Sequence, residues 1–137
     1  MFTKLLIEVH VATNAEKAWA CYTDPQHITQ WNFASPDWHC PSASNDLRVG
    51  GKYIARMEAR DGSFGFDFEG IYSAVEQGSS LSYGLSDGRK VEVRFQPTAE
   101  GTRVEVEFDA ENENPIELQK GGWQAILNNY AKHTDQQ

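Results

Sequence analysis

Apolar and polar residues alternate along six segments of this chain. In the first of them, Leu5, Ile7, Val9 and Val11 recur at every second position, which is the period of a strand with one buried face. Five further segments repeat this alternation, and their apolar positions are Tyr53, Ala55 and Met57; Phe64, Phe66, Phe68 and Tyr72; Leu81, Tyr83 and Leu85; Val91, Val93 and Phe95; and Val104, Val106 and Phe108. The pattern therefore predicts about six or seven strands.

Short turns separate the later strands. The turn-forming pairs are Asp61-Gly62, Gly78-Ser79, Asp87-Gly88 and Glu100-Gly101. Such pairs between alternating runs are typical of hairpins. Because a parallel sheet would need a helix at each of these points, the spacing predicts an antiparallel meander.

Two short helices are expected between the first strand and the meander. Thr13 to Glu16 match a capping box with Thr13 as the cap, so a helix should run to about Tyr22. Asp24-Pro25 combines a cap with proline at the first turn and predicts a second helix that ends near Trp31. Residues Asn32 to Pro41 have no period and contain two prolines, so we interpret them as an irregular loop.

A long C-terminal helix follows the last strand. Pro115 suits its first turn with Asn114 as the cap, and the apolar residues Trp123, Ile126, Leu127 and Tyr130 follow at i, i+3, i+4 and i+7. Gly121-Gly122 would let this helix approach the sheet closely. The economical arrangement is an α+β fold in which a curved antiparallel sheet wraps around the C-terminal helix.

Composition restricts the partners and the location. A chain of 137 residues fits one domain, residues 1–137, and its net charge of -8 opposes binding to nucleic acid or an anionic membrane. No segment reaches the ~20 apolar residues of a membrane span, and no leader peptide is recognisable. Cys21 and Cys40 lack metal or disulfide spacing, so we expect reduced thiols, a cytoplasmic protein and no cofactor.

Several short motifs resemble one family. They are Thr23-Asp24-Pro25 followed by Trp31; Asp46-Leu47-Arg48-Val49-Gly50-Gly51; Gly70-Ile71-Tyr72; Gly101-Thr102-Arg103; and Gly122-Trp123 leading into Leu127. In this order they resemble the activator of heat-shock-protein-90 ATPase homologue (AHSA-type) family of the START-like, helix-grip superfamily. The resemblance covers nearly the whole chain. It implies a helix-grip fold, but no shared set of catalytic residues to transfer.

Parity predicts which side chains could line an interior site. Tyr53, Met57, Phe66, Phe68, Tyr72, Tyr83 and Phe95 share the sheet face that the C-terminal helix should cover. With the helices and the loop added, the candidate ligand-binding residues are Trp31, Phe33, Trp38, His39, Tyr53, Met57, Phe66, Phe68, Tyr72, Tyr83, Phe95, Trp123 and Leu127. For any one of these aromatic residues, a plain core position is the commoner outcome.

Histidines are the remaining polar candidates. His39 follows Trp38 in the apolar loop, with Asp37 close enough to orient it, so it is a weak catalytic candidate. A loop histidine packed on aromatic rings is more often structural. His27 and His133 have no ligand at i+4 on their helices, and we predict no metal site.

Three functions are compatible with these features. The first is a binding protein for a small hydrophobic or lipid-like molecule, with its cavity between the sheet and the C-terminal helix and a possible role in stress. The second is an enzyme similar to polyketide cyclases or dehydratases, for which His39 with Tyr53, Tyr72 or Tyr83 is the available polar pair; we lean against catalysis. The third, implied by the family resemblance, is a chaperone-interacting protein. The exposed aromatic loop leaves a homodimer open.

Overall fold

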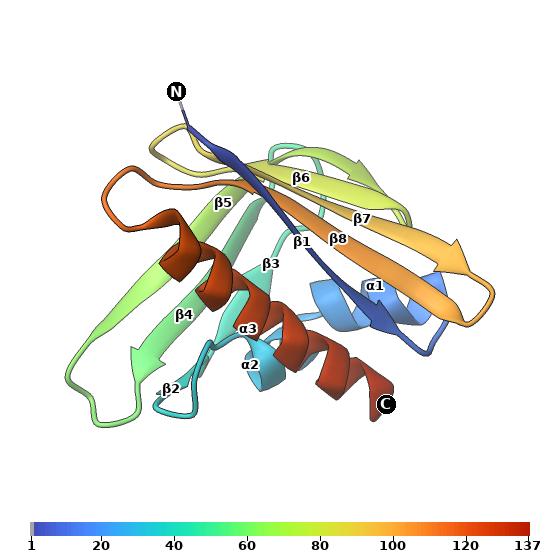
Figure 1. The fold of residues 1–137 in the computed structure, drawn as a ribbon, viewed down its shortest axis with the longest axis horizontal. Coiled ribbons are helices and arrows are strands. Elements are labelled where there is room, and N and C mark those ends of the chain that lie inside the picture. The colour runs from blue at the N-terminus through green and yellow to red at the C-terminus, as the bar shows by residue number, and fades with distance from the viewer. Residues whose placement is uncertain (1) are drawn as a thin grey trace.

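A curved antiparallel sheet surrounds one long helix in the computed structural model, which describes residues 2–137 (Figure 1). The elements in chain order are β1 (Lys4–Val11), α1 (Ala15–Thr23), α2 (Pro25–Trp31), β2 (Trp38–His39), β3 (Ala43–Asn45), β4 (Lys52–Ala59), β5 (Gly65–Glu76), β6 (Ser80–Gly84), β7 (Lys90–Thr98), β8 (Gly101–Asp109) and α3 (Ile116–Asp135). The predicted helix-grip fold class is confirmed.

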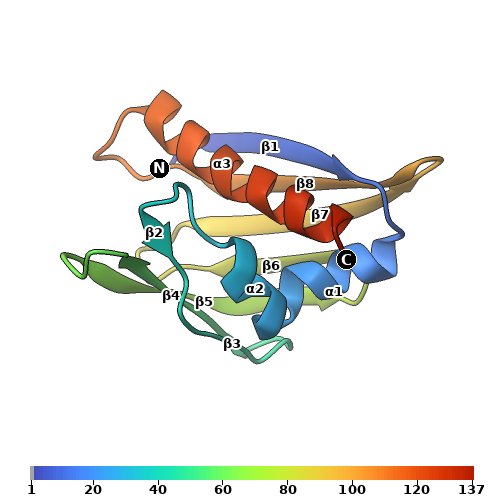
Figure 2. The same ribbon diagram turned by 90° about the horizontal axis from the view of Figure 1, so that it is seen from below.

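The sheet has eight strands in the order β1-β8-β7-β6-β5-β4-β2, and β3 also pairs with β4. Consecutive strands from β4 to β8 are neighbours, as the hairpin turns predicted. β1 pairs with β8 instead of its neighbour in sequence, and this pairing places the first and last strands side by side. Figure 2 shows the sheet curled around α3, with α1 and α2 beside the C-terminal half of that helix.

The two shortest strands were not predicted. β2 has two residues and β3 has three, and both pair with β4. Segments of this length are too short to show an alternating pattern, and β2 lies in the stretch interpreted as an irregular loop. Their pairing extends the sheet beyond the predicted number of strands.

Alternating residues of the long strands form the core. Ile7, Val93 and Val106 occupy matching register positions on three adjacent strands, and all three are buried. Phe95 packs edge-on against Trp19 of α1 at a ring distance of 5.3 Å. The period-2 pattern therefore identified the buried face of these strands correctly.

Two helix caps differ from their predictions. Asn14, rather than Thr13, caps α1, and its side chain accepts a hydrogen bond from the N–H of Lys17 at 2.8 Å. The Thr13 carbonyl instead accepts from the Thr102 hydroxyl. The predicted cap Asn114 lies one residue before the N-cap position of α3, which Pro115 occupies, and its amide group donates to the Glu111 carboxylate at 2.8 Å.

The glycine pair on α3 does not serve a close helix–sheet contact. A Cβ atom at Gly121 or Gly122 would meet no heavy atom within 4 Å. The prediction of close approach is wrong, because this part of α3 borders an open groove. A true close approach occurs at Gly70, where a Cβ would lie 2.4 Å from the ring of Tyr83.

Candidate functional site

A cavity of about 260 Å³ lies between the inner face of the sheet and α3. Every helix and five strands contribute to it. The lining residues are Ile7, Tyr22, Trp31, Asn32, Tyr53, Met57, Phe66, Phe68, Tyr83, Arg89, Val106, Trp123, Ile126 and Leu127. The site is therefore built from segments far apart in the sequence, held together by the curl of the sheet.

Aromatic rings form most of the cavity wall. Trp123 of α3 stacks on Phe108 with ring centroids 4.1 Å apart, and Phe68 meets Trp123 edge-on at 6.0 Å. Phe68 also packs against Tyr53 and Tyr83. Edge-to-face contacts of this kind fix the orientation of each ring. The wall is thus a connected set of apolar surfaces that can hold an apolar molecule.

The uncharged polar groups of the cavity are amide and phenol groups. Asn32 is 7% exposed, and its Nδ2 donates to the Tyr53 hydroxyl at 2.9 Å. The hydroxyls of Tyr22 and Tyr83 form no hydrogen bond with any other residue in the described range 2–137. These two hydroxyls are free to bind water or a polar group on a ligand.

Burial keeps these phenols neutral. Desolvation raises the pKa of Tyr22, Tyr53 and Tyr83, and the nearby phenols reinforce the increase. Tyr72 lies next to this group, and burial raises its pKa to about 12 although its hydroxyl donates to Asn45 Oδ1 at 2.7 Å. The floor of the cavity therefore offers neutral hydrogen-bonding groups.

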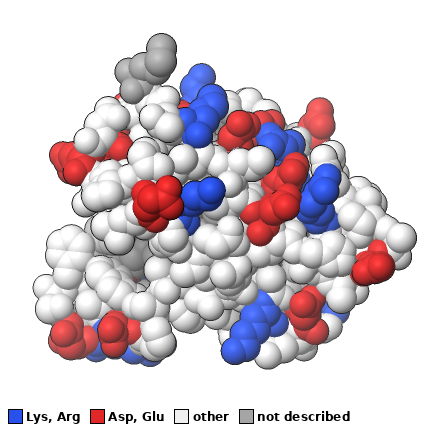
Figure 3. All heavy atoms as spheres, in the orientation of Figure 1, with Lys and Arg blue, Asp and Glu red and all other residues white. Residues whose placement is uncertain are grey.

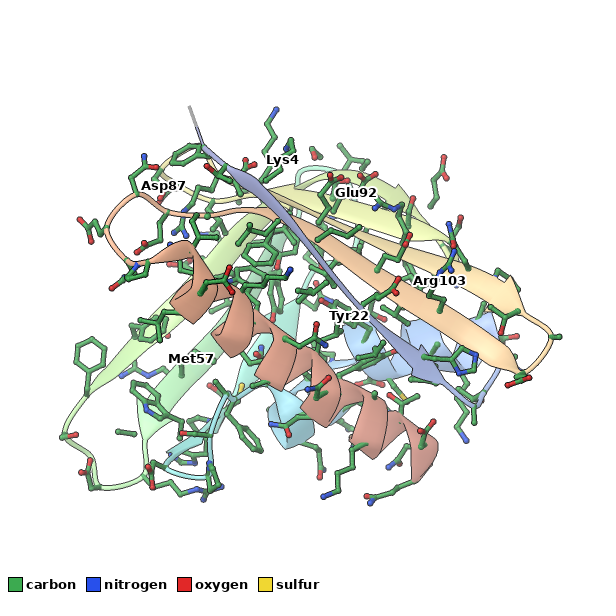
Figure 4. All side chains as sticks on the ribbon, in the orientation of Figure 1. Lys4, Tyr22, Met57, Asp87, Glu92 and Arg103 are labelled. Atoms are coloured by element: carbon green, nitrogen blue, oxygen red, sulfur yellow. The ribbon has the colours of Figure 1, made fainter. Side chains whose placement is uncertain are left out.

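One charged side chain lies among the lining residues. Arg89 follows β6, and its Nε donates to the Asp87 carboxylate at 2.7 Å. Asp87, labelled in Figure 4, projects at the edge of the molecule, away from α3. The ion pair leaves this wall close to electrically neutral.

A groove continues the cavity toward solvent. It measures about 450 Å³ and shares Met57, Phe66, Trp123 and Ile126 with the cavity. Figure 3 shows the surface hollowed beside the N-terminal half of α3, among side chains without charge. In Figure 4, Met57 and Tyr22 lie on opposite sides of α3, with Met57 nearer this hollow and Tyr22 nearer β1. We describe the groove as the mouth of the cavity.

The mouth exposes large apolar side chains. Phe66 is 41% exposed and Leu118 on α3 is 65% exposed. Trp38 lines the groove, and its ring packs against Phe66 and Phe64. An apolar surface next to a cavity is the feature expected of an entrance for an apolar molecule.

The structure brings most of the predicted site residues together. Trp31, Tyr53, Met57, Phe66, Phe68, Tyr83, Trp123 and Leu127 line the cavity, and Trp38 lines its mouth. Phe95 lies in the core against Trp19 and Tyr22. Tyr72 is buried beside Tyr83, and the Phe33 carbonyl accepts from the Asn129 amide at the surface of α3.

His39 lies outside the cavity lining. It is on β2, where its Nε2 is 3.7 Å from the Glu58 carboxylate across the strand pair. The neighbouring Asp37 uses its carbonyl to accept from the N–H of Arg60. His39 is therefore not placed to act with the cavity tyrosines.

Sequence reasoning missed several lining residues. Ile7, Val106 and Ile126 belong to the predicted apolar faces of their elements, and parity cannot divide such a face between core and cavity wall. Tyr22 was seen only as the end of a helix. Asn32 gave no signal, because a loop residue has no period to reveal the direction of its side chain.

No helix among residues 2–137 combines the length and the apolar character needed to cross a bilayer. On the face in Figure 3, acidic and basic side chains are interspersed. Arg94 and Arg103, on the outer face of the sheet, both form ion pairs with Glu105, at 3.4 Å and 3.8 Å.

Comparisons with known proteins agree with this architecture. The profile of the family described as Activator of Hsp90 ATPase homolog 1-like protein matches residues 12–134. The solution structure of an AHSA1-like protein from Aeromonas hydrophila is 41% identical, with a TM-score of 0.92 over 98% of this chain and 93% of that one. A protein from Cytophaga hutchinsonii is 44% identical, with a TM-score of 0.84 over 97% of this chain and 92% of that one.

More distant structures share the fold alone. A protein from Chromobacterium violaceum has 19% identity and a TM-score of 0.87 over 97% of this chain and 98% of that one. No functionally curated protein matches the sequence.

Proposed function

The chain belongs to the Activator of Hsp90 ATPase homolog 1-like family, and we propose that it binds a small hydrophobic or lipid-like molecule between the sheet and α3. One observation carries this proposal. The cavity has an aromatic and aliphatic wall and an apolar mouth, and the hydroxyls of Tyr22 and Tyr83 have no hydrogen-bond partner within residues 2–137. A container of this kind suits a ligand with an apolar body and one neutral polar group.

The same chemistry supports binding over catalysis. General acid–base catalysis works best with a group whose pKa lies near the working pH. The cavity phenols are neutral because burial raises their pKa, and His39 lies outside the lining. The proposal therefore assigns the cavity a holding role rather than a cyclase-like or dehydratase-like reaction.

Three broader features belong to the same proposal. We propose that residues 1–137 act as one START-like domain in the cytoplasm, because both cysteines are free and buried, as in a reducing compartment. A second copy could cover the exposed apolar mouth. A role in stress rests on the family description alone.

A pair of isoleucine variants tests the binding site. Ile126 lines both the cavity and its mouth, so Ile126→Trp should fill the entrance. Ile71 is an exposed residue of β5 on the outer surface, so Ile71→Trp adds the same side chain away from the cavity. We expect a fluorescent fatty-acid probe to bind the original protein and Ile71→Trp saturably, and Ile126→Trp at least tenfold more weakly.

Two outcomes of the probe experiment would contradict the proposed binding site. Equal probe affinity in the two variants would place the binding site elsewhere on the protein. Failure of the probe to saturate the original protein would reject the cavity as a fatty-acid site.

A further inference from the structure

A cluster of metal-ligating residues lies where the three helices meet. Cys21 is on α1, His27 is on α2 and His133 is in the last turn of α3. One ligand atom from each of the three lies within 4.8 Å of the other two. None of these residues lines the cavity. Helical spacing could not reveal the cluster, because each helix contributes a single ligand.

The two imidazoles already face one another. His27 Nδ1 is 2.8 Å from His133 Nε2, so one ring donates a hydrogen bond and the other accepts it. The ring nitrogen that accepts this hydrogen bond carries a free electron pair, so at least one of the two imidazoles is neutral. A neutral imidazole is the form that binds a metal.

The thiol has an unusual polar neighbour. Cys21 is a free cysteine, 1% exposed, and the Thr134 hydroxyl lies beside its thiol. Thr134 is 1% exposed, and its hydroxyl has no hydrogen-bond partner of acceptable geometry among residues 2–137. An unpaired buried hydroxyl next to a thiol can donate a hydrogen bond to a thiolate.

The distances suit a tetrahedral ion after small movements. Zinc bonds of about 2.0–2.1 Å to nitrogen and about 2.3 Å to sulfur put the two nitrogens about 3.3 Å apart and each nitrogen about 3.6 Å from the sulfur. The two histidine nitrogens, now 2.8 Å apart, would move slightly away from each other. All three ligand atoms lie within 4.8 Å of one another, so the most distant two would approach by about 1 Å. Both histidines are half-buried, which leaves a fourth position for water.

We propose that Cys21, His27 and His133 bind one Zn²⁺ ion. The Cys21 thiol gives its proton to solvent, the sulfur and the two imidazole nitrogens donate electron pairs to the ion, and no oxidation is involved. The ion would fasten the C-terminal end of α3 to α1 and α2. This site is separate from the proposed ligand cavity, so either proposal can fail without the other.

Titration calorimetry with ZnCl₂ on the metal-free full chain tests the stoichiometry and the ligands. We expect one ion per chain, with affinity at least tenfold weaker in His27→Gln and in His133→Gln. His10→Gln is the matched control, because His10 lies on β1 and contacts Thr98. No saturable binding, or equal affinity in both ligand variants and the control, would overturn the proposal.

Cobalt reports the thiolate directly. With CoCl₂ in place of ZnCl₂, the protein should show a thiolate-to-cobalt charge-transfer band that Cys21→Ser lacks and Cys40→Ser keeps. Both cysteines are buried, so the second variant controls for the loss of a buried thiol. A band that persists in Cys21→Ser, or that is absent from the original protein, would overturn the assignment. If Cys21→Ser does not fold, the calorimetry of the histidine variants decides.

Discussion

Tyrosines around the cavity differ in the hydrogen-bond partners of their hydroxyl groups. The Tyr53 hydroxyl accepts from Asn32 inside the cavity, and the Tyr130 hydroxyl ties α3 to α1 by donating to the Ala18 carbonyl at 2.7 Å. The Tyr83 hydroxyl has no hydrogen-bond partner among residues 2–137. Similar phenol groups therefore have different effects on stability.

Two phenylalanine variants separate these effects. Tyr53→Phe leaves the buried Asn32 amide without its partner, so we expect the free energy of unfolding to fall by about 1–2 kcal/mol. Tyr83→Phe removes a hydroxyl that has no hydrogen-bond partner in the described part of the chain, so its change should stay within about 0.5 kcal/mol. Urea denaturation measures both. Equal losses in the two variants would contradict the hydrogen-bond assignment.

Single residues were predictable where a period exists. Parity placed Tyr53, Phe68 and Tyr83 on the inner face of the sheet, and all three line the cavity. It could not separate a cavity wall from a filled core, and Phe95 proved to be core. The convergence of His27 and His133 depends on the packing of α3 against α2, which no local pattern encodes.

At the scale of elements, the sequence predicted the hairpins and the helices well, but it predicted the residues at which the helices begin less well. Alternation and turn residues identified the long strands, and Asp24-Pro25 marked the start of α2 correctly. The caps of α1 and α3 lie one residue after the predicted positions: Asn14 caps α1, and Pro115, which makes no side-chain capping hydrogen bond, occupies the N-cap of α3. β2 and β3 form only through pairing with β4.

Replacing a glycine by alanine should have opposite effects on stability in α3 and in β5. Gly121→Ala places a methyl group in open space on a helix, so we expect stability to rise by about 1 kcal/mol. Gly70→Ala would push a Cβ atom into the Tyr83 ring, so it should destabilise the protein by about 1–3 kcal/mol and weaken probe binding. The melting temperatures of the two variants, compared with that of the original protein, test both expectations. A stabilised Gly70→Ala variant would contradict the close contact with Tyr83.

At the scale of the whole molecule, the curled sheet cannot close completely on α3. Side chains fill the space between the sheet and α3 except for a cavity of about 260 Å³. If that volume were empty, it would cost about 6 kcal/mol at ~24 cal/mol per Å³, which is comparable to the stability of a domain. Water on the polar floor or a ligand on the apolar wall offsets this cost, so occupancy and stability should be linked.

Native mass spectrometry is the first measurement to make for a ligand site between the sheet and α3. The protein and Ile126→Trp are each incubated with a mixture of fatty acids and small aromatic compounds, and their intact complexes are weighed. We expect a one-to-one complex with the original protein that is absent or strongly reduced in Ile126→Trp. Bare chains in both samples, or the same complex in both, would contradict a ligand site between the sheet and α3.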